Sequence, residues 1–271
     1  MTDATDPLEG FSRTEFTALG KTRDVYRTGS GPAVIVMSEV PGITPLVAAF
    51  GRTVAESGFT AVLPHLFGTP GRAPSLGALA STMAEVCISR EFTLLAQGRS
   101  SPVVGWLRAL AAEEHDRCGG PGVGAVGMCL TGGFALAMMV DDRVVAPVLS
   151  QPSLPVALGR ARRRDLGISP EDLARVRERA AEGTCVLGLR FTGDRMVPAE
   201  RFERLREELG DAFVAVELDS SKGNPHGHPA IAHSVLTEHL QDRAGTPTRA
   251  ALDQVLAFFS ERLLPATAVD G

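Results

Sequence analysis

The sequence lacks the features that mark membrane-spanning, exported and nucleic-acid-binding proteins. No apolar run reaches transmembrane length, and the first six residues are polar and acidic, the opposite of a signal peptide. Basic residues are outnumbered, 27 Lys and Arg against 32 Asp and Glu, and a net charge of −5 argues against a nucleic-acid-binding surface. We therefore expect a cytoplasmic protein whose partner is a small molecule, with no nucleic acid and no membrane. The oligomeric state is left open.

Cysteine is also scarce, and its spacing excludes the usual paired sites. Cys87, Cys118, Cys129 and Cys185 form no CxxC pair and no metal-like spacing, so we expect free thiols and no metal site. Cys87 lies in an apolar helical pattern, Cys118 in a predicted loop, and Cys185 at the start of an apolar strand that favours the core. Only Cys129 has surroundings that indicate chemistry.

Apolar runs of strand length alternate with helical patterns along most of the chain. Strands are predicted at 33–37, 59–63, 144–149, 185–191 and 213–218, and helices at 45–56, 79–97, 102–114, 199–208 and 250–264. This alternation predicts an α/β fold with a mostly parallel sheet and helices on both faces. Since no repeat or linker divides the chain, we expect one domain over 1–271, with residues 1–30 as an N-terminal edge extension containing a hairpin.

The stretch from Val123 to Ala137 has the pattern of a strand, a sharp turn and a helix. An apolar run ends at Gly127, and the turn reads Gly-x-Cys-x-Thr-Gly-Gly around Cys129. Small residues allow such a turn to project its central side chain at the carboxyl end of the strand. The helix amino terminus behind a thiol favours its anionic form. A catalytic thiol is therefore favoured over the alternative, a buried cysteine at a glycine-rich strand end.

Further polar residues follow other predicted strands. Glu39 and Asp194 each come just after a strand, and histidines follow the strand at 213–218. The carboxyl ends of parallel strands meet at one edge of a sheet, where ligands bind. The chain order of nucleophile, acid and histidine is that of α/β-hydrolases, and these groups are what nucleophilic acyl transfer requires. The residues alone leave open an ordinary turn role for Asp194.

The choice of histidine also stays open at this point. Four histidines lie downstream of the last predicted strand: His226, His228, His233 and His239. The first two flank Gly227 as a metal-like pair, but no third ligand accompanies them.

The chain resembles the dienelactone hydrolase family. The segments that carry the resemblance are Ser38–Ile43, Gly58–Pro64, the turn around Cys129, Gly193–Pro198 and Ala232–Val235. It implies an α/β-hydrolase fold and cofactor-free hydrolysis of an ester or lactone, as by a carboxymethylenebutenolidase. It also implies a catalytic triad of Cys129, Asp194 and His233, with Glu39 as the partner of the resting thiol. His233-Ser234 resembles the family's Gly-His-Ser-Phe motif, and His233 precedes Phe258 by 25 residues, which selects it over His226 and His228.

The sequence departs from the family pattern in three places. Thr131 replaces a glycine of the turn, where a β-branched side chain should crowd the helix against its strand. The loop at 220–232 is longer than the pattern. Thr237 stands where the family has an anion-binding arginine, although Arg90 corresponds to its other substrate-binding arginine. A dienelactone carboxylate would therefore be held by fewer positive groups, which concerns the substrate more than the chemistry.

The expected reaction also needs donors for the oxyanion. We expect them to be the backbone N–H groups of Leu130, just past the nucleophile, and Val40. The basic cluster at 160–164 is interpreted as a solvated helix end or loop rather than an anion clamp.

Two other functions remain compatible with the sequence. One is a non-catalytic α/β-hydrolase scaffold that binds a ligand or senses redox state through its thiol. The other is a different hydrolase chemistry, such as peptide or C–C bond cleavage.

Overall fold

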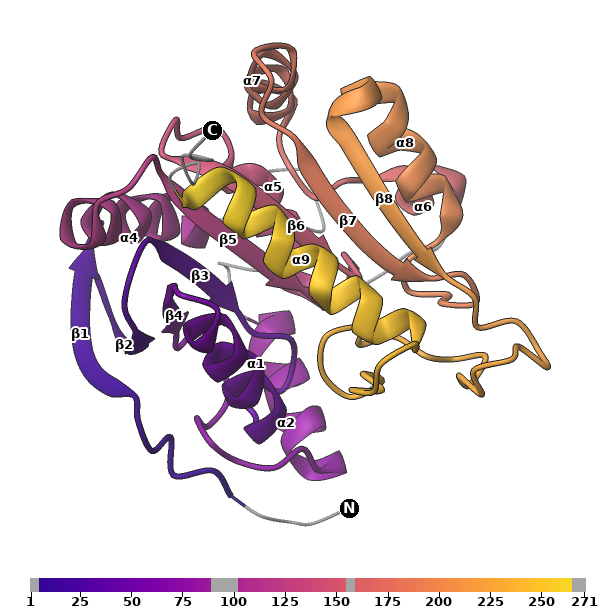
Figure 1. Ribbon diagram of the computed structural model, residues 1–271, viewed down its shortest axis with the longest axis horizontal. Helices are drawn as coiled ribbons and strands as arrows, with labels where there is room; N and C mark the ends of the chain where they lie inside the picture. Colours follow the sequence, from indigo (N-terminus) through magenta and orange to yellow (C-terminus); the bar gives the residue numbers. More distant parts are fainter. Residues whose placement is uncertain (1–4, 89–101, 155–158, 265–271) are drawn as a thin grey trace, which may run out of the picture.

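The computed structural model describes residues 5–88, 102–154 and 159–264, and within them an eight-stranded sheet runs through the molecule (Figure 1). The strand order is β1-β2-β4-β3-β5-β6-β7-β8, antiparallel at the β1-β2 and β2-β4 pairs and parallel from β4 to β8. The strands are β1 (Ser12–Ala18), β2 (Lys21–Gly29), β3 (Ala33–Met37), β4 (Thr60–Pro64), β5 (Val123–Met128), β6 (Val144–Ser150), β7 (Val186–Phe191) and β8 (Phe213–Leu218).

Helices cover both faces of this sheet, as predicted. They are α1 (Pro45–Glu56), α2 (Leu76–Ile88), α4 (Pro102–Cys118), α5 (Gly132–Met138), α6 (Arg160–Arg164), α7 (Pro170–Ala181), α8 (Ala199–Leu209) and α9 (Pro247–Leu263), with short 3-10 turns η2 (Cys129–Thr131) and η3 (Gly210–Ala212). Helices α1 and α9 pack on one face, and α4, α5, α7 and α8 on the other (Figure 1). None of the described helices combines the length and apolar character needed to cross a membrane.

Strand β3 shows why the sequence specifies two cores. Ala33, Ile35 and Met37 pack with α4 and α5, whereas Val34 and Val36 pack with α1 and α9. Because side chains alternate between the faces of a strand, an uninterrupted apolar run serves a sheet that is covered on both sides. All five residues of this strand are fully buried.

The predicted elements agree closely with the structure, and the differences lie at their ends. The strands at 33–37 and 213–218 and the helix at 45–56 have the expected bounds, and the N-terminal hairpin forms as β1 and β2. The predicted helix 79–97 begins earlier, at Leu76, and its residues 89–97 lie outside the described residues.

Two cysteine assignments were wrong. Cys185 precedes β7 and is partly exposed, because the buried strand begins only at Val186. Cys118 is the last residue of α4 rather than part of a loop. The side chain of Cys87 lies outside the described part of the structure.

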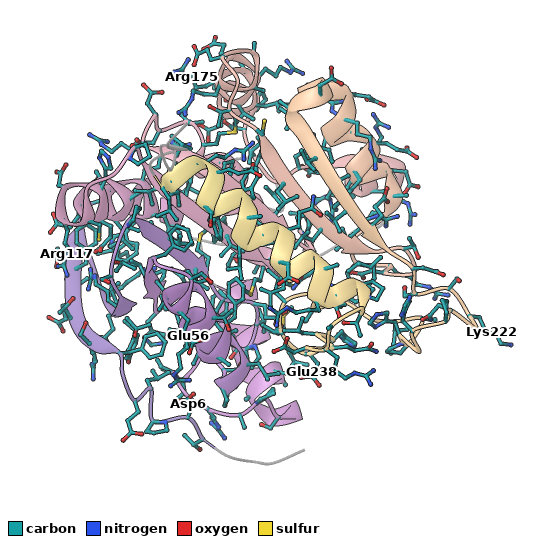
Figure 2. The ribbon with its side chains drawn as sticks, viewed as in Figure 1. Asp6, Glu56, Arg117, Arg175, Lys222 and Glu238 are labelled. Carbon is teal, nitrogen blue, oxygen red and sulfur yellow. The ribbon has the colours of Figure 1, made fainter. Side chains whose placement is uncertain are left out.

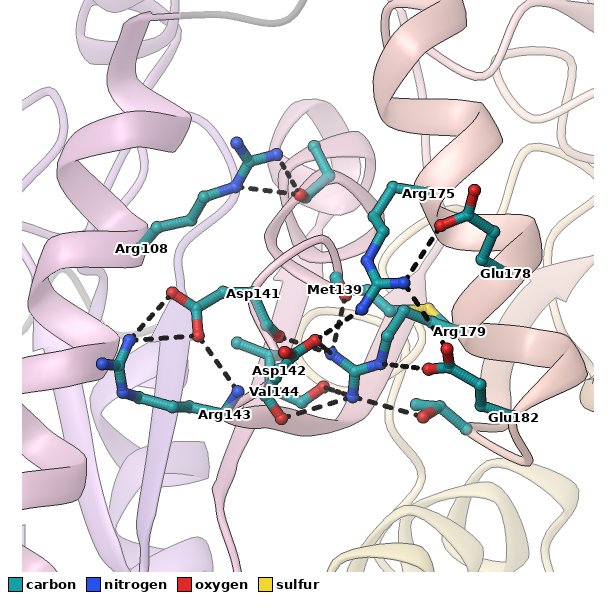
Figure 3. Close-up of polar contacts among 12 residues, drawn as sticks. Arg108, Met139, Asp141, Asp142, Arg143, Val144, Arg175, Glu178, Arg179 and Glu182 are labelled. Atoms are coloured by element: carbon teal, nitrogen blue, oxygen red, sulfur yellow. Dashed lines mark hydrogen bonds and ion pairs between the residues drawn. The ribbon is translucent and has the colours of Figure 1, made fainter.

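Helix α7 fixes the chain between α5 and β6 through a buried arginine (Figure 3). The Arg179 guanidinium donates to the backbone carbonyls of Met139 (3.2 Å), Asp141 (2.8 Å) and Val144 (3.4 Å). These carbonyls belong to the end of α5, the turn into β6 and the first residue of β6. The contact therefore holds α5, the helix behind the Cys129 turn, against its neighbours.

The basic cluster at 160–164 forms α6, a short helix that packs on α8. Arg163 pairs with Glu200 (2.7 Å) and Arg164 with Glu207. Neither arginine lines the cavity at Cys129 described below. These contacts agree with a helix at the surface rather than an anion clamp.

Candidate active site

Cys129 sits on a strained turn between β5 and α5. Its φ angle is +55°, a left-handed conformation that costs a non-glycine residue roughly 1–3 kcal/mol. Gly127 permits the turn, because a Cβ there would lie 2.1 Å from the Thr131 carbonyl oxygen. The thiol is 9% exposed and lines a cavity of about 310 Å³. The sequence therefore places a buried thiol on a cavity wall.

Thr131 bonds the turn to β3 instead of only crowding it. Its Oγ1 accepts the Met128 N–H at 2.8 Å and lies 3.0 Å from the carbonyl oxygen of Met37, the last residue of β3. The side chain is fully buried. The threonine at the glycine position thus ties the strand that leads to Glu39 to the turn that carries Cys129.

Asp194 and His233 meet at the carboxyl end of the sheet. The Nδ1 of His233 donates to Oδ2 of Asp194 at 2.6 Å, and Oδ1 of the same carboxylate accepts the Met196 N–H at 2.9 Å. The second ring nitrogen of His233, Nε2, is buried and has no hydrogen-bond partner among the described residues. The imidazole is thus fixed by the carboxylate and presents one free nitrogen.

The electrostatics of His233 reflect these neighbours. Burial alone lowers the pKa of the imidazole, but the hydrogen bond to Asp194 and the interaction with Cys129 outweigh it and raise the pKa to about 10. His233 and Cys129 line the same cavity. The imidazole therefore faces both a carboxylate and a thiol.

The other candidate histidines lie elsewhere on the long loop. His228 is buried beside the Phe191 ring, its N–H is bound by the Asn224 side chain, and burial lowers its pKa. The backbone of His226 accepts a hydrogen bond from Gln241. Within the described ranges, no three His, Cys, Asp or Glu side chains gather as a metal site. Of the predicted candidates, the structure brings His233 to Asp194.

Glu39 lies in the same cavity and is held by uncharged donors. Its Oε2 accepts from Ser234 Oγ at 2.5 Å and from Gln151 Nε2 at 3.1 Å, and its Oε1 accepts from Thr237 Oγ1. The residue is 8% exposed. The hydroxyl of Thr237, which stands in place of the expected arginine, therefore binds this carboxylate.

Sequence reasoning missed Ser153 and Gln151, which follow β6. The Ser153 Oγ lies 3.0 Å from the Cys129 Sγ, and its N–H donates to the Cys129 carbonyl at 2.9 Å. Gln151, with a φ of +37°, also accepts the Val235 N–H and so joins the Glu39 and His233 loops. A polar Ser-Gln-Pro-Ser stretch at the end of a buried strand was the available signal.

Two of the remaining predicted residues, Leu130 and Val40, lie at the thiol cavity. They line it together with Leu79, Leu154 and Met196. Leu130 lies in the first helical turn after Cys129, where N–H groups lack intrahelical partners. Arg90 lies outside the described residues.

Comparison with known proteins places this arrangement in a family. The family model for the dienelactone hydrolase family matches residues 21–262. The chain belongs to the dienelactone hydrolase family. Membership over this span supports a hydrolase and agrees with the α/β-hydrolase fold of the mixed sheet. No curated protein matches the chain in sequence.

Solved structures share the fold at low sequence identity. A dienelactone hydrolase described as putative, from Klebsiella pneumoniae, has a TM-score of 0.60 at 19% identity, covering 93% of this chain and 98% of its own. The dienelactone hydrolase-like promiscuous phosphotriesterase P91 from metagenomic libraries has a TM-score of 0.57 at 16% identity, covering 93% and 98%. A cold-adapted esterase from an Arctic intertidal metagenomic library has 0.56 at 14%, covering 97% and 98%.

Proposed function

We propose that the protein hydrolyses carboxylic esters or lactones through Cys129, His233 and Asp194. The observation that carries this proposal is the position of His233, which is bound to Asp194 at Nδ1 and lines the cavity of the thiol. Its buried Nε2 has no hydrogen-bond partner among the described residues. An imidazole that a carboxylate orients and that lies beside a thiol nucleophile is what acyl transfer requires. No cofactor takes part in this reaction.

The proposed reaction has two steps. The Cys129 sulfur attacks the carbonyl carbon as the thiol proton passes to His233, and the Leu130 and Val40 N–H groups stabilise the oxyanion, each by about 3 kcal/mol. The C–O bond to the alcohol breaks, and His233 gives the leaving oxygen its proton. Water, deprotonated by His233, then attacks the thioester, which releases the acid and restores the thiol. Asp194 holds the imidazole and stabilises its protonated form.

Glu39 is proposed as the partner of the resting thiol. Its carboxylate shares the cavity with Cys129, and a second negative charge close by is unfavourable. Substrate binding would displace the carboxylate or let it accept the thiol proton. Arg90, as a further proposal, contacts the substrate. A single domain in the cytoplasm also remains our expectation.

A panel of aryl esters and unsaturated lactones tests the proposed function. Wild type is expected to hydrolyse members of the panel, and Cys129→Ala to lose that activity by orders of magnitude, while Cys118→Ala serves as the matched control. Iodoacetamide should label Cys129 first, with parallel loss of activity. Full activity in Cys129→Ala would refute the proposal. A thiol that oxidises reversibly in a protein inactive on the whole panel would favour the sensing scaffold instead.

A further inference from the structure

A second cavity adjoins the thiol cavity. It has a volume of about 360 Å³ and is lined by the loop after β3, the start of α1, the start of α2 and the His233 loop. Glu39, Val40, Leu79 and Ser234 line both cavities. Each volume alone is at the lower end of the range for ligand sites, so the two together suit a ligand that extends across both.

Exposed apolar side chains surround these two openings. Among the described residues, the large hydrophobic side chains with high exposure include Leu46 (41%), Leu79 (43%) and Met196 (49%). Leu46 lines the second cavity, Met196 lines the thiol cavity and Leu79 lines both. Exposed apolar residues that gather at a cavity mark a binding surface rather than scattered surface residues.

The charges around the cavities argue against an anionic ligand. No Lys or Arg of the described part of the chain lines either cavity, whereas Glu39 and Glu238 both line the second one. Figure 2 shows Glu238 on the loop near α2. Thr237, in the position of the family's arginine, is bound to Glu39. A carboxylate in the second cavity would meet the negative charge of Glu39 and Glu238, with no compensating cation among the residues that the structure describes.

From these observations we propose that the two cavities form one bipartite site for an ester with an apolar, uncharged group on each side of the scissile bond. The thiol cavity, with Met196 and Leu154, holds one group, and the second cavity, with Leu46 and Leu79, holds the other. Each methylene removed from water at either end strengthens binding roughly fourfold. This proposal rests on the proposed ester hydrolysis and names its substrate class.

The test uses esters that differ at one end at a time. Hydrolysis of methyl acetate, hexyl acetate, methyl hexanoate and hexyl hexanoate is followed by titrating the released acid at constant pH. We expect kcat/KM to rise at least tenfold on lengthening either end, mainly through KM. Leu46→Arg should abolish the rise in kcat/KM on lengthening the group held by the second cavity. Met196→Arg should abolish the rise on lengthening the group held by the thiol cavity. Leu19→Arg, which changes an exposed leucine on the β1-β2 turn, should abolish neither.

The charge requirement is tested with a matched anion. Monomethyl hexanedioate should be hydrolysed at least tenfold less efficiently than methyl hexanoate, because its carboxylate replaces a methyl group. Equal or better hydrolysis of the anion overturns the inference. So does a rise in kcat/KM on lengthening only one end of the ester. The inference is also overturned if both arginine variants abolish that rise at the same end. If none of the esters is hydrolysed, or Cys129→Ala hydrolyses them fully, the proposed function itself fails.

Discussion

Glu39 is held by three neutral donors, and this decides what its replacement should do. Ser234, Thr237 and Gln151 all point a hydrogen toward its carboxylate. A glutamate that only occupied a loop would be solvated, and its replacement would change stability by less than about 0.5 kcal/mol. A buried carboxylate that accepts hydrogen bonds from three donors contributes more than this to the free energy of unfolding.

Glu39→Gln should lower the free energy of unfolding by roughly 1–3 kcal/mol, because the glutamine NH₂ group faces a donor that then lacks an acceptor. The pH dependence of Cys129 alkylation and the turnover number should change as well, since the neighbouring negative charge is lost. Urea unfolding, iodoacetamide kinetics and ester hydrolysis measure the three effects. Glu56→Gln, at an exposed glutamate of α1, is the control (Figure 2). An unchanged alkylation profile with unchanged turnover would leave Glu39 without a role at the thiol.

The contact with Asp194 makes the stability of the fold vary with pH in the alkaline range. The pKa of His233 is raised from its ordinary value of 6.5 to about 10, so the folded state holds a proton that the unfolded chain releases earlier. The protonated imidazole therefore contributes stability that is fully present below pH 6.5 and is lost as the pH rises through about 10.

Asp194→Asn should weaken this dependence. The asparagine removes the carboxylate and leaves the burial, so the pKa of His233 falls and the loss of stability moves to lower pH. Urea unfolding at several pH values between about 6 and 10 compares the variant with wild type. If the free energy of unfolding varies with pH in the same way in the two proteins, Asp194 does not set the protonation of His233.

At the scale of elements, the turn between β5 and α5 depends on close backbone packing. A Cβ on Gly132 would lie 2.6 Å from the Cα and Cβ of Pro152. Pro152 is itself held, because the buried Arg201 of α8 donates to its carbonyl at 2.8 Å. Ser153, the next residue, contacts the thiol. The glycine therefore lets α5 approach the segment that carries Ser153.

Gly132→Ala should push Pro152 and Ser153 away from Cys129 and lower kcat/KM by about tenfold or more, since small displacements at a reacting group are costly. Gly77→Ala is the matched control, because a Cβ at this position in α2 meets nothing within 4 Å. An alanine there should stabilise the helix by up to about 1 kcal/mol and leave the kinetics unchanged. Equal kinetic effects of the two substitutions would contradict the packing account.

The elements themselves could be predicted because their signals are local. The apolar run of β3 and the glycines around Cys129 each specify structure within a few residues. Ser153, Gln151 and Thr131 could not be assigned roles, since their contacts depend on which distant loops meet. The bond from Ser234 to Glu39 joins positions 195 residues apart.

At the scale of the whole molecule, the sheet order assembles the site. Strands β3, β5, β6, β7 and β8 run parallel, so the segments that follow them carry Glu39, Cys129, Ser153, Asp194 and His233 to the same edge. The sequence predicted this edge from the α/β alternation. It could not predict the path of residues 219–246, which form no helix or strand and include His233, whose ring is bound by Asp194.

Whether Cys129 carries the acyl group can be determined by trapping the intermediate. Wild type is mixed with a 4-nitrophenyl ester, quenched in acid during the first turnovers, digested and analysed by mass spectrometry. We expect the acyl mass on the peptide that contains Cys129, removable by neutral hydroxylamine as is usual for a thioester, and no such adduct in Cys129→Ala. An acyl group found on Ser153 instead, or full turnover in Cys129→Ala with no adduct, would contradict this expectation.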